Sequence, residues 1–172
     1  MAQLKRDAEF TEYVHARTPW LRRIAYLLCH DWHRANDLTQ AALLKLYVHW
    51  DRARKAEHFD GYVRSVLVNT FLNEQQTTWW KRISLSGSAT SGETEEDIAQ
   101  VLAGDIDASL DLIEALAGVP PRQRAVLVLR YYCDLSVAQT AEALRCSPGT
   151  VKSQASRGLE ALRAVLNAQP AI

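Results

Sequence analysis

Two consecutive helix starts near the carboxyl end place the strongest constraint on what this chain can fold into. They lie in the stretch SVAQTAEALRCSPGTVKSQASRGLEALR, residues 136–163. Ser136 and Gln139 have the S-x-x-Q spacing of a capping box, in which each side chain bonds a backbone N–H at the helix start. After a short break, Ser147 can act as an N-cap and Pro148 suits the first turn, where its missing N–H costs nothing. The pattern predicts a helix-turn-helix.

The second of these helices has an apolar side and a polar side. The apolar side is expected to face inward, with members at i, i+4 spacing: Val151, Ala155, Leu159, Leu162 and Val165. The polar side has hydroxyls, an amide and cations near the amino end of the helix: Thr150, Lys152, Ser153, Gln154 and Arg157. A helix-turn-helix places this end in the major groove of DNA. We expect DNA recognition here, the alternative being an ordinary helical hairpin with a solvated basic side.

Composition fits a folded protein with one domain or two small ones. Hydrophobic residues make up 48% of the 172 residues and aromatic residues 8%, too many for a disordered chain. No apolar run approaches the ~18 residues that span a bilayer, and the first ten residues lack the apolar core of a secretory signal. The three cysteines, Cys29, Cys133 and Cys146, have no C-x-x-C spacing and fit a reducing compartment. We therefore expect a cytoplasmic protein.

The net charge of zero conceals three blocks of different sign. Residues 1–82 hold 13 Lys and Arg against 9 Asp and Glu, residues 83–117 hold none against 8, and residues 118–172 hold 7 against 3. Two basic ends with an acidic middle indicate two surfaces for phosphates and one segment that avoids them.

Helical periodicity dominates residues 1–82 and returns at residue 109, and strand signals are weak throughout, so we expect an all-α fold. Thr18-Pro19 predicts a helix start or a kink. Asn36 or Asp37 is expected to cap a helix that runs to Trp50, and Asp60 to cap the next one after a charged loop. Residues 84–108 are rich in Ser, Gly, Thr and acids, which predicts a flexible acidic linker that has room for a short helix near residues 95–102.

Two amino-terminal stretches leave alternatives open. The predicted helix DLTQAALLKLYVHW has apolar residues all round, so it has a second partner: another helix of the domain, which composition favours, or a docking protein. Residues 58–82 have side chains that can bind melted DNA in three ways. Aromatic rings can stack on unpaired bases: Phe59, Tyr62, Trp79 and Trp80. The amides of Asn69 and Asn73 can read base edges, and Arg64, Lys81 and Arg82 can hold phosphates. Taken alone, the stretch favours aromatics in a core and cations in solvent.

Catalytic and metal-binding patterns are weak. Cys29, His30 and His33 form a C-H-x-x-H cluster, but a fourth ligand is absent nearby, so we interpret the two histidines as surface residues and expect no metal. The sequence contains no Gly-rich phosphate loop, G-x-S-x-G or H-E-x-x-H. We expect no catalytic residue and no cofactor.

Two separate blocks resemble the extracytoplasmic-function (ECF) group of bacterial sigma-70 factors, in particular an actinobacterial sigma-E-like subfamily. FTEYVHARTPWLRRIAYLLCHDWHRANDLTQAALLKLYVHW with FDGYVRSVLVNTFLNE is similar to region 2 of the family, and VPPRQRAVLVLRYYCDLSVAQTAEALRCSPGTVKSQASRGLEALR to region 4. The resemblance implies two helical domains, region 2 over residues 1–82 and region 4 over 109–172, joined by the linker 83–108. It implies an alternative sigma factor that binds core RNA polymerase, directs it to −35/−10 promoters and promotes DNA melting.

The resemblance also assigns residues to partners. Contacts to the β′ clamp helices of core polymerase fall on Asp37, Leu38, Gln40, Leu44 and Tyr47. Contacts to a flipped base and melted DNA of the −10 element fall on His58, Phe59, Tyr62, Arg64, Asn69 and Asn73, with Asn69 the foremost candidate for the base pocket. The polar side of the helix-turn-helix faces the −35 element. Region 4 would meet the β flap, the linker would thread the RNA-exit channel, and an anti-sigma factor is a further partner to consider.

Five residues depart from the family pattern. Arg145 stands where Gly is common in the turn, and a left-handed Arg145 would carry strain of about 1 kcal/mol. Gln154 and Ala155 replace a common Arg-Leu pair, Ala41 replaces a frequent acid and Thr140 a usual aliphatic residue. These bear on promoter sequence and affinity rather than on the class.

Two other functions remain as alternatives. A helix-turn-helix regulator with a sensing or dimerising amino-terminal domain would be dimeric and bind a palindrome, whereas a sigma factor would be monomeric and inert on duplex DNA without polymerase. A helical adaptor or metal-binding protein would use Cys29, His30 and His33.

Overall fold

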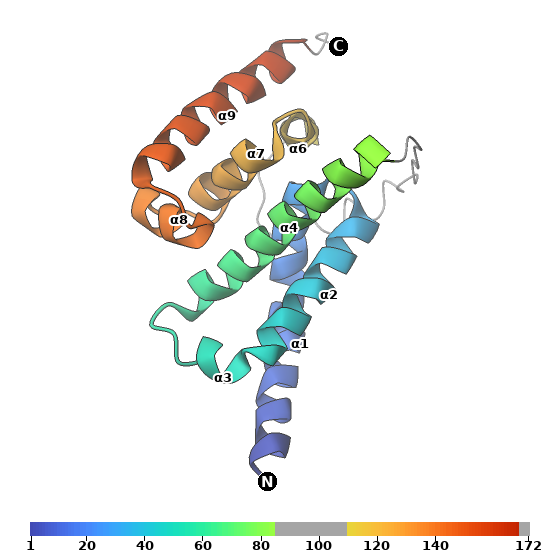
Figure 1. The fold of residues 1–172 in the computed structure, drawn as a ribbon, viewed down its shortest axis with the longest axis vertical. Helices are drawn as coiled ribbons and strands as arrows, with labels where there is room; N and C mark the ends of the chain where they lie inside the picture. The colour runs from blue at the N-terminus through green and yellow to red at the C-terminus, as the bar shows by residue number, and fades with distance from the viewer. Residues whose placement is uncertain (85–109, 169–172) are drawn as a thin grey trace.

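The computed structural model describes residues 1–84 and 110–168, and every regular element in these ranges is helical, which confirms the all-α prediction. The amino-terminal group comprises α1 (Ala2–Cys29), α2 (Trp32–Val48), α3 (Trp50–Ala53) and α4 (Phe59–Ser84). The carboxyl-terminal group comprises α6 (Leu110–Ala117), α7 (Pro121–Leu127), the π-helical turn η1 (Val128–Tyr132), α8 (Val137–Leu144) and α9 (Pro148–Ala168). The start of α1 and the end of α9 lie at opposite ends of the molecule (Figure 1).

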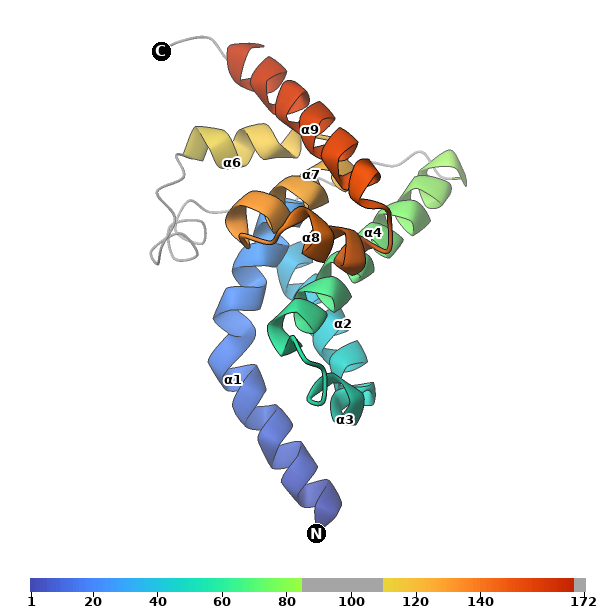
Figure 2. The ribbon, with the colours of Figure 1, turned by 90° about the vertical axis from the view of Figure 1, so that its left-hand side faces the viewer.

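The amino-terminal group is built around long, fully buried side chains from α1, α2 and α4. Leu21, Ile24 and Leu28 of α1 meet Leu38 and Leu46 of α2 and Leu67 and Phe71 of α4, all below 2% exposed. Proline 19 lies inside α1, so the helix runs on past it and the alternative of a helix start at Thr18-Pro19 is wrong. Figure 2 shows α1 bending partway along its length, as expected of a helix that lacks one backbone donor.

Two predicted caps in this group are also wrong. Helix α2 begins several residues earlier than expected because Asp31, rather than Asn36 or Asp37, caps it: its carboxylate accepts the N–H of Arg34 at 3.0 Å. Helix α4 begins at Phe59, one residue before the expected cap Asp60. The Asp60 carboxylate instead pairs with Arg17 at 2.7 Å, and the predicted charged loop contains the short helix α3.

The carboxyl-terminal group has the predicted helix-turn-helix. The capping box is complete: Gln139 N donates to Ser136 Oγ at 3.0 Å and Ser136 N to Gln139 Oε1 at 2.8 Å. Helix α9 begins at Pro148, and Thr150 N donates to Ser147 Oγ at 3.1 Å. The turn between α8 and α9 passes through Arg145, whose φ of 53° places it in the left-handed region, the case in which strain was expected.

The two groups of helices pack against each other. Helices α7 and α8 lie on α4, and α6 and α7 lie on α1 (Figures 1 and 2). Buried residues from both groups, among them Leu28, Phe71, Ile113 and Ala125, form one continuous apolar cluster. The sequence indicated two modules joined by a linker, and it did not indicate that the modules contact each other. The contacts join residues about 70 to 100 positions apart, and local sequence patterns carry no information about such pairs.

Part of the chain lies outside the described residues, and the helices of the described part were compared with what a membrane span requires. Residues 85–109, with the predicted helix near 95–102, and the side chains of Trp79, Trp80, Lys81 and Arg82 lie outside the described residues. Within residues 1–84 and 110–168, none of the helices is both long and apolar enough for a bilayer crossing.

Candidate nucleic-acid interface

Helix α9 presents its predicted polar side to solvent. Val151 is 0% exposed and anchors the start of the helix in the core, so the side chains around it are held outward. Lys152, Ser153 and Arg157 are exposed, and Thr150 and Gln154 are half-buried. The Thr150 hydroxyl lies 2.9 Å from Ser147 Oγ, which fixes the first turn. A cationic and hydroxyl-bearing surface at the amino end of a second helix is the arrangement that helix-turn-helix proteins use on DNA.

The predicted −10 residues divide between core, surface and a contact with the other group of helices. Phe59 is a packing residue, with its ring 5.0 Å from Tyr13 and 5.6 Å from Trp50 between centroids. Tyr62 is half-buried against the core, while His58 and Asn73 are exposed. These positions spread along the first half of α4 and the turn before it.

Arg64 lies in a small cationic and aromatic cluster at the surface of the bundle. Its guanidinium carbon lies 5.1 Å from the Trp20 ring centroid, and that of Arg17 lies 4.8 Å from the same ring. Arg17 also pairs with Asp60. The indole therefore holds two cations beside the start of α4, which keeps positive charge next to the residues predicted to meet melted DNA.

Asn69 is engaged inside the protein. Its Nδ2 donates to the carbonyl oxygen of Ala143 in α8 at 2.8 Å, and to Ser65 O at 2.8 Å and Ser65 Oγ at 3.1 Å in its own helix. The Ser65 hydroxyl donates to the same Ala143 oxygen at 3.0 Å. Two α4 side chains thus converge on one carbonyl at the carboxyl end of α8.

The outer side of α2 carries an apolar surface. Leu44 is 66% exposed and Val48 is 64% exposed, with the exposed Asp37 and Gln40 on the preceding turns. Leu38 is 0% exposed and belongs to the core, so its side chain is not available to a partner at this surface. Exposed aliphatic side chains one turn apart on a helix are typical of a protein docking site.

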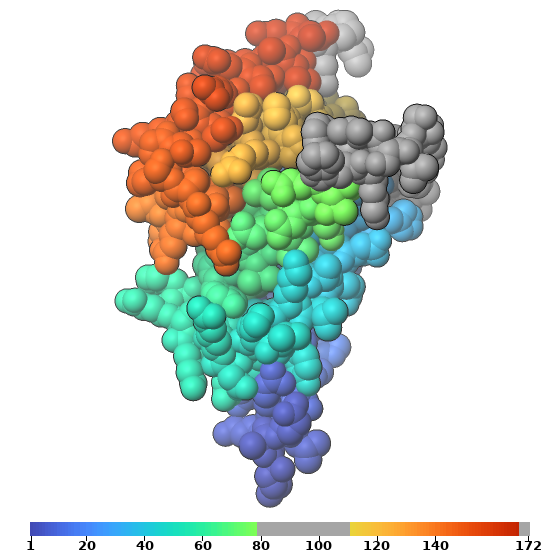
Figure 3. All heavy atoms as spheres, in the orientation of Figure 1, coloured from blue at the N-terminus to red at the C-terminus, as the bar shows by residue number. Residues whose placement is uncertain are grey.

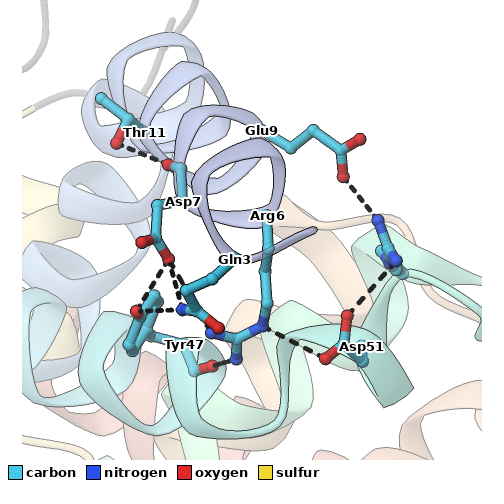
Figure 4. A network of polar contacts seen from close by, with 8 residues as sticks. Gln3, Arg6, Asp7, Glu9, Thr11, Tyr47 and Asp51 are labelled. Atoms are coloured by element: carbon cyan, nitrogen blue, oxygen red, sulfur yellow. Dashed lines mark hydrogen bonds and ion pairs between the residues drawn. The ribbon is translucent and has the colours of Figure 1, made fainter. Parts of the chain in front are cut away.

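Tyr47 is the fifth predicted polymerase contact, and it lies in a polar network at the junction of α1, α2 and α3 (Figure 4). Its hydroxyl donates to Asp7 at 2.8 Å and accepts from Gln3 at 3.3 Å, and its ring lies 5.0 Å from Phe10. Arg6 donates to Asp51 at 3.2 Å and to the Tyr47 carbonyl. Tyr47 is half-buried by these contacts and contributes mainly to fixing α1 on α2.

The C-H-x-x-H cluster does not form a metal site. No three His, Cys, Asp or Glu side chains of residues 1–84 and 110–168 lie close enough together to hold an ion. Burial raises the pKa of Cys29 to about 12 and that of Cys133 to about 11, so both are protonated thiols at neutral pH. His33 is exposed, but His30 is half-buried, so the prediction of surface histidines is wrong for His30. Burial, with a smaller contribution from Arg124, lowers the pKa of His30 to about 4.

Comparison with known proteins matches both groups of helices to one family. Residues 13–81 match the family model for sigma-70 region 2, and residues 109–162 match that for sigma-70 region 4. The RNA polymerase sigma-E factor of Streptomyces coelicolor is 37% identical over 94% of this chain and 88% of its own length. The ECF RNA polymerase sigma factor SigL of Mycobacterium tuberculosis is 31% identical over 88% of this chain and 84% of its own length. The ECF RNA polymerase sigma factor SigW of Bacillus subtilis is 26% identical over 90% of this chain and 87% of its own length.

A solved structure shares the fold. Sigma factor RpoE of Bartonella quintana, in complex with the anti-sigma factor NepR, has a TM-score of 0.70 at 22% identity, over 94% of this chain and 99% of that chain. A likeness over that share of both chains includes both groups of helices.

The matches to regions 2 and 4 of one family, in that order along the chain, define a transcription initiation factor. The chain belongs to the sigma-70 family and is an ECF RNA polymerase sigma factor. It acts with core RNA polymerase and promoter DNA and directs the enzyme to promoters.

Three residues that bear on these sites were not among the site residues predicted from the sequence. Val48 shares the exposed apolar surface of α2, and its place one turn after Leu44 was a usable signal. Ser65 and Arg124 contact backbone carbonyls of the other group of helices. No local pattern indicates such contacts, because the acceptors are backbone carbonyl oxygens, which every residue type has.

Proposed function

We propose that this sigma factor holds core polymerase through the outer side of α2 and reads a promoter at two places. In this proposal Asp37, Gln40, Leu44 and Val48 meet the β′ clamp helices, and the carboxyl-terminal group meets the β flap and the −35 element. Support for the first contact comes from the exposure of Leu44 and Val48, which is unusual for aliphatic residues of these sizes.

The observation that carries the DNA-binding proposal is the exposed polar side of α9. Lys152 and Arg157 can neutralise phosphates, and Thr150, Ser153 and Gln154 can donate to or accept from base edges in the major groove. Because Gln154 is neutral where the family commonly has Arg, we infer one fewer phosphate contact and a flatter dependence of affinity on salt.

DNA melting is assigned to α4 and the turn before it. Extruding one base from the duplex costs a few kcal/mol of stacking and pairing, so it needs a site with polar groups at the base edge. An asparagine amide can bond adenine with both its donor and its acceptor. Asn69 is proposed to supply that amide, with Arg64 and Arg17 holding the backbone beside it and His58 and Asn73 at the two ends of the surface.

In the same proposal the chain catalyses no reaction itself and works in the cytoplasm, where its polymerase works. The acidic residues 83–108 are proposed to enter the RNA-exit channel and to occupy it until the RNA, also a polyanion, takes their place. An anti-sigma factor is a third proposed partner, on the ground that the Bartonella neighbour was solved with one.

Asn69→Ala tests the role in melting. We expect the variant holoenzyme to form the initial promoter complex with nearly unchanged affinity and to open the DNA at least tenfold more slowly, because the base pocket acts after encounter. Mobility shift measures the first step and permanganate reactivity of unpaired thymines the second. Gln76→Ala, an exposed amide on the same helix, is the matched control. An equal loss in both steps would contradict the assignment.

A further inference from the structure

Arg145 has a backbone conformation that its residue type rarely adopts. Among the described residues, three that are not glycine have a positive φ: His30 at 55°, Asp134 at 54° and Arg145 at 53°. Histidine and aspartate are among the residue types enriched in this left-handed region, whereas arginine is not. Strained residues of this kind cluster at binding sites, so the Arg145 side chain is a candidate for a function.

The backbone around Arg145 is held in place by its neighbours. Arg145 N donates to Glu142 O at 3.3 Å, and Cys146 N donates to Ala141 O at 3.0 Å, which closes the carboxyl end of α8. Two residues later, Ser147 caps the start of α9. The turn is therefore fixed by backbone contacts and a cap that do not involve the Arg145 side chain.

The Arg145 side chain is exposed and has no polar partner in the part of the chain that the structure describes. No ion pair between residues 1–84 and 110–168 includes its guanidinium, although the exposed Glu142 lies one turn earlier in α8. Arg124 and Arg130 of the same group, by contrast, donate to backbone carbonyls. Contacts within the protein thus do not account for an arginine at position 145.

Arg145 belongs to an uninterrupted basic segment. Residues 143–159 contain three cations, Arg145, Lys152 and Arg157, and no acid. All three are exposed, and Figure 3 shows the end of α8 and the start of α9, in orange, at one edge of the molecule. The charge of Arg145 therefore adds to that of the polar side of α9.

The turn of a helix-turn-helix has a defined place on DNA. The second helix enters the major groove with its amino end, and the first helix crosses the phosphate backbone. The turn joins these two helices, so it lies next to the phosphates at the edge of the groove. The carboxyl end of α8 brings the negative pole of a helix dipole to this place, and a cation there offsets its repulsion of phosphate.

We propose that Arg145 binds a phosphate of the −35 element and fixes the helix-turn-helix on the DNA backbone without reading a base. This rests on the proposed function, in which α9 lies in the major groove of the −35 element. One phosphate contact releases about one condensed cation from DNA, so it is detected through the salt dependence of binding. It contributes equally whatever the base sequence.

The test compares initial promoter complexes of holoenzymes that contain the full-length chain, at a temperature too low for DNA opening. Arg145→Gln removes the charge and Arg145→Lys keeps it, and both keep the Cβ and hence the backbone strain. Arg122→Gln removes an exposed cation of α7 and is the matched control. Mobility shift measures affinity from about 50 to 200 mM salt. Two duplexes are used: a promoter that the wild-type holoenzyme transcribes, and the same promoter with an altered −35 sequence.

We expect Arg145→Gln to bind about fivefold more weakly than wild type, the effect of losing one charged hydrogen bond at a surface. The slope of log affinity against log salt should become less steep by about 0.9, and the loss should be equal on both duplexes. Arg145→Lys should keep the wild-type slope, since lysine also binds phosphate, and Arg122→Gln should behave as wild type. An unchanged slope in Arg145→Gln, an equal loss in Arg145→Lys, an equal loss in Arg122→Gln or a loss on one duplex alone would each overturn the proposal.

A purely structural role of Arg145 gives a different result. A cation that only stabilises the negative end of α8 affects folding and not DNA binding. Arg145→Gln would then lower the free energy of unfolding in urea and leave the salt slope unchanged, which would also overturn the proposal.

Failure of this inference is distinguishable from failure of the proposed function. Lys152→Gln and Arg157→Gln are measured in the same assay. If both make the slope less steep and Arg145→Gln does not, α9 binds the −35 element and Arg145 has no part in it. If none of the three changes the slope, the assignment of α9 to the −35 element is itself wrong.

Discussion

His30 is a half-buried histidine that follows the end of α1, near Arg124, and burial lowers its pKa from 6.5 to about 4. A group whose folded pKa is depressed in this way binds its proton more readily when unfolded, so the free energy of unfolding falls as pH drops from about 6.5 to about 4. We expect His30 to account for about 1–2 kcal/mol of the loss between pH 7.5 and 5. Urea denaturation at both pH values, compared with His30→Asn, isolates this share because Asn tolerates the left-handed backbone there (φ 55°). Equal pH dependence in both chains would refute it.

Arg145 also has a left-handed backbone, at φ 53° in the turn of the helix-turn-helix. A side chain in this region carries about 1 kcal/mol of strain, and glycine removes it at some cost in unfolded-state entropy. We therefore expect Arg145→Gly to raise the free energy of unfolding by about 0.5 kcal/mol. Arg145→Ala keeps the Cβ and the strain, so it should give no gain. Urea denaturation of wild type and the two variants measures the free energy of unfolding. A gain in Arg145→Gly alone indicates relief of strain, and an equal gain in both variants indicates an effect of losing the arginine side chain.

At the scale of elements, α2 offers a prediction about binding that is independent of stability. Leu44 and Val48 are about two-thirds exposed, so replacing both with Gln should leave the free energy of unfolding within about 0.5 kcal/mol of wild type. If they meet core polymerase, the same change should weaken binding at least tenfold. Leu4→Gln, at a leucine 72% exposed on α1, is the control for a general loss of surface apolarity. Titration of labelled sigma factor with core polymerase measures the effect, and an affinity equal to that of the control would remove α2 from the interface.

Helix boundaries were predictable where the cap and the helix it starts lie within a few residues of each other. Ser136 was identified by the S-x-x-Q spacing of its capping box, and Ser147 by the proline that follows it. Helix α2 has three acceptable caps within seven residues, Asp31, Asn36 and Asp37, and burial of Ala35 in the core selects the first. Local chemistry states which residues can cap a helix, and packing decides which of them does.

The candidate surfaces were predictable to the extent that periodicity sets exposure. On α9 the spacing separated Val151 from Lys152 and Arg157. On α2 the sequence showed more apolar residues than one buried side needs, but not which of them are exposed. Whether Leu38 or Leu44 faces solvent depends on how α2 is rotated against α1 and α4, and the sequence of α2 alone does not determine this rotation. The same holds for Phe59, whose packing on Tyr13 and Trp50 is a property of three elements.

At the scale of the whole molecule, Arg124 links the packing between the two groups of helices to the fold of the carboxyl-terminal group. It is 9% exposed and its guanidinium donates to four carbonyls, three within its own group and one at the end of α1. Burial lowers its pKa, yet the charge is kept because every one of these acceptors favours the cation.

Arg124→Lys keeps the charge but cannot reproduce a planar fork that reaches four acceptors, so some helix-end carbonyls lose their donor. We expect the free energy of unfolding, measured by urea denaturation, to fall by about 2 kcal/mol. Arg122→Lys, two residues away and exposed, should leave the free energy of unfolding unchanged. An equal loss in both variants would show that a lysine in this helix is destabilising whatever its contacts, and that the four carbonyls do not depend on Arg124.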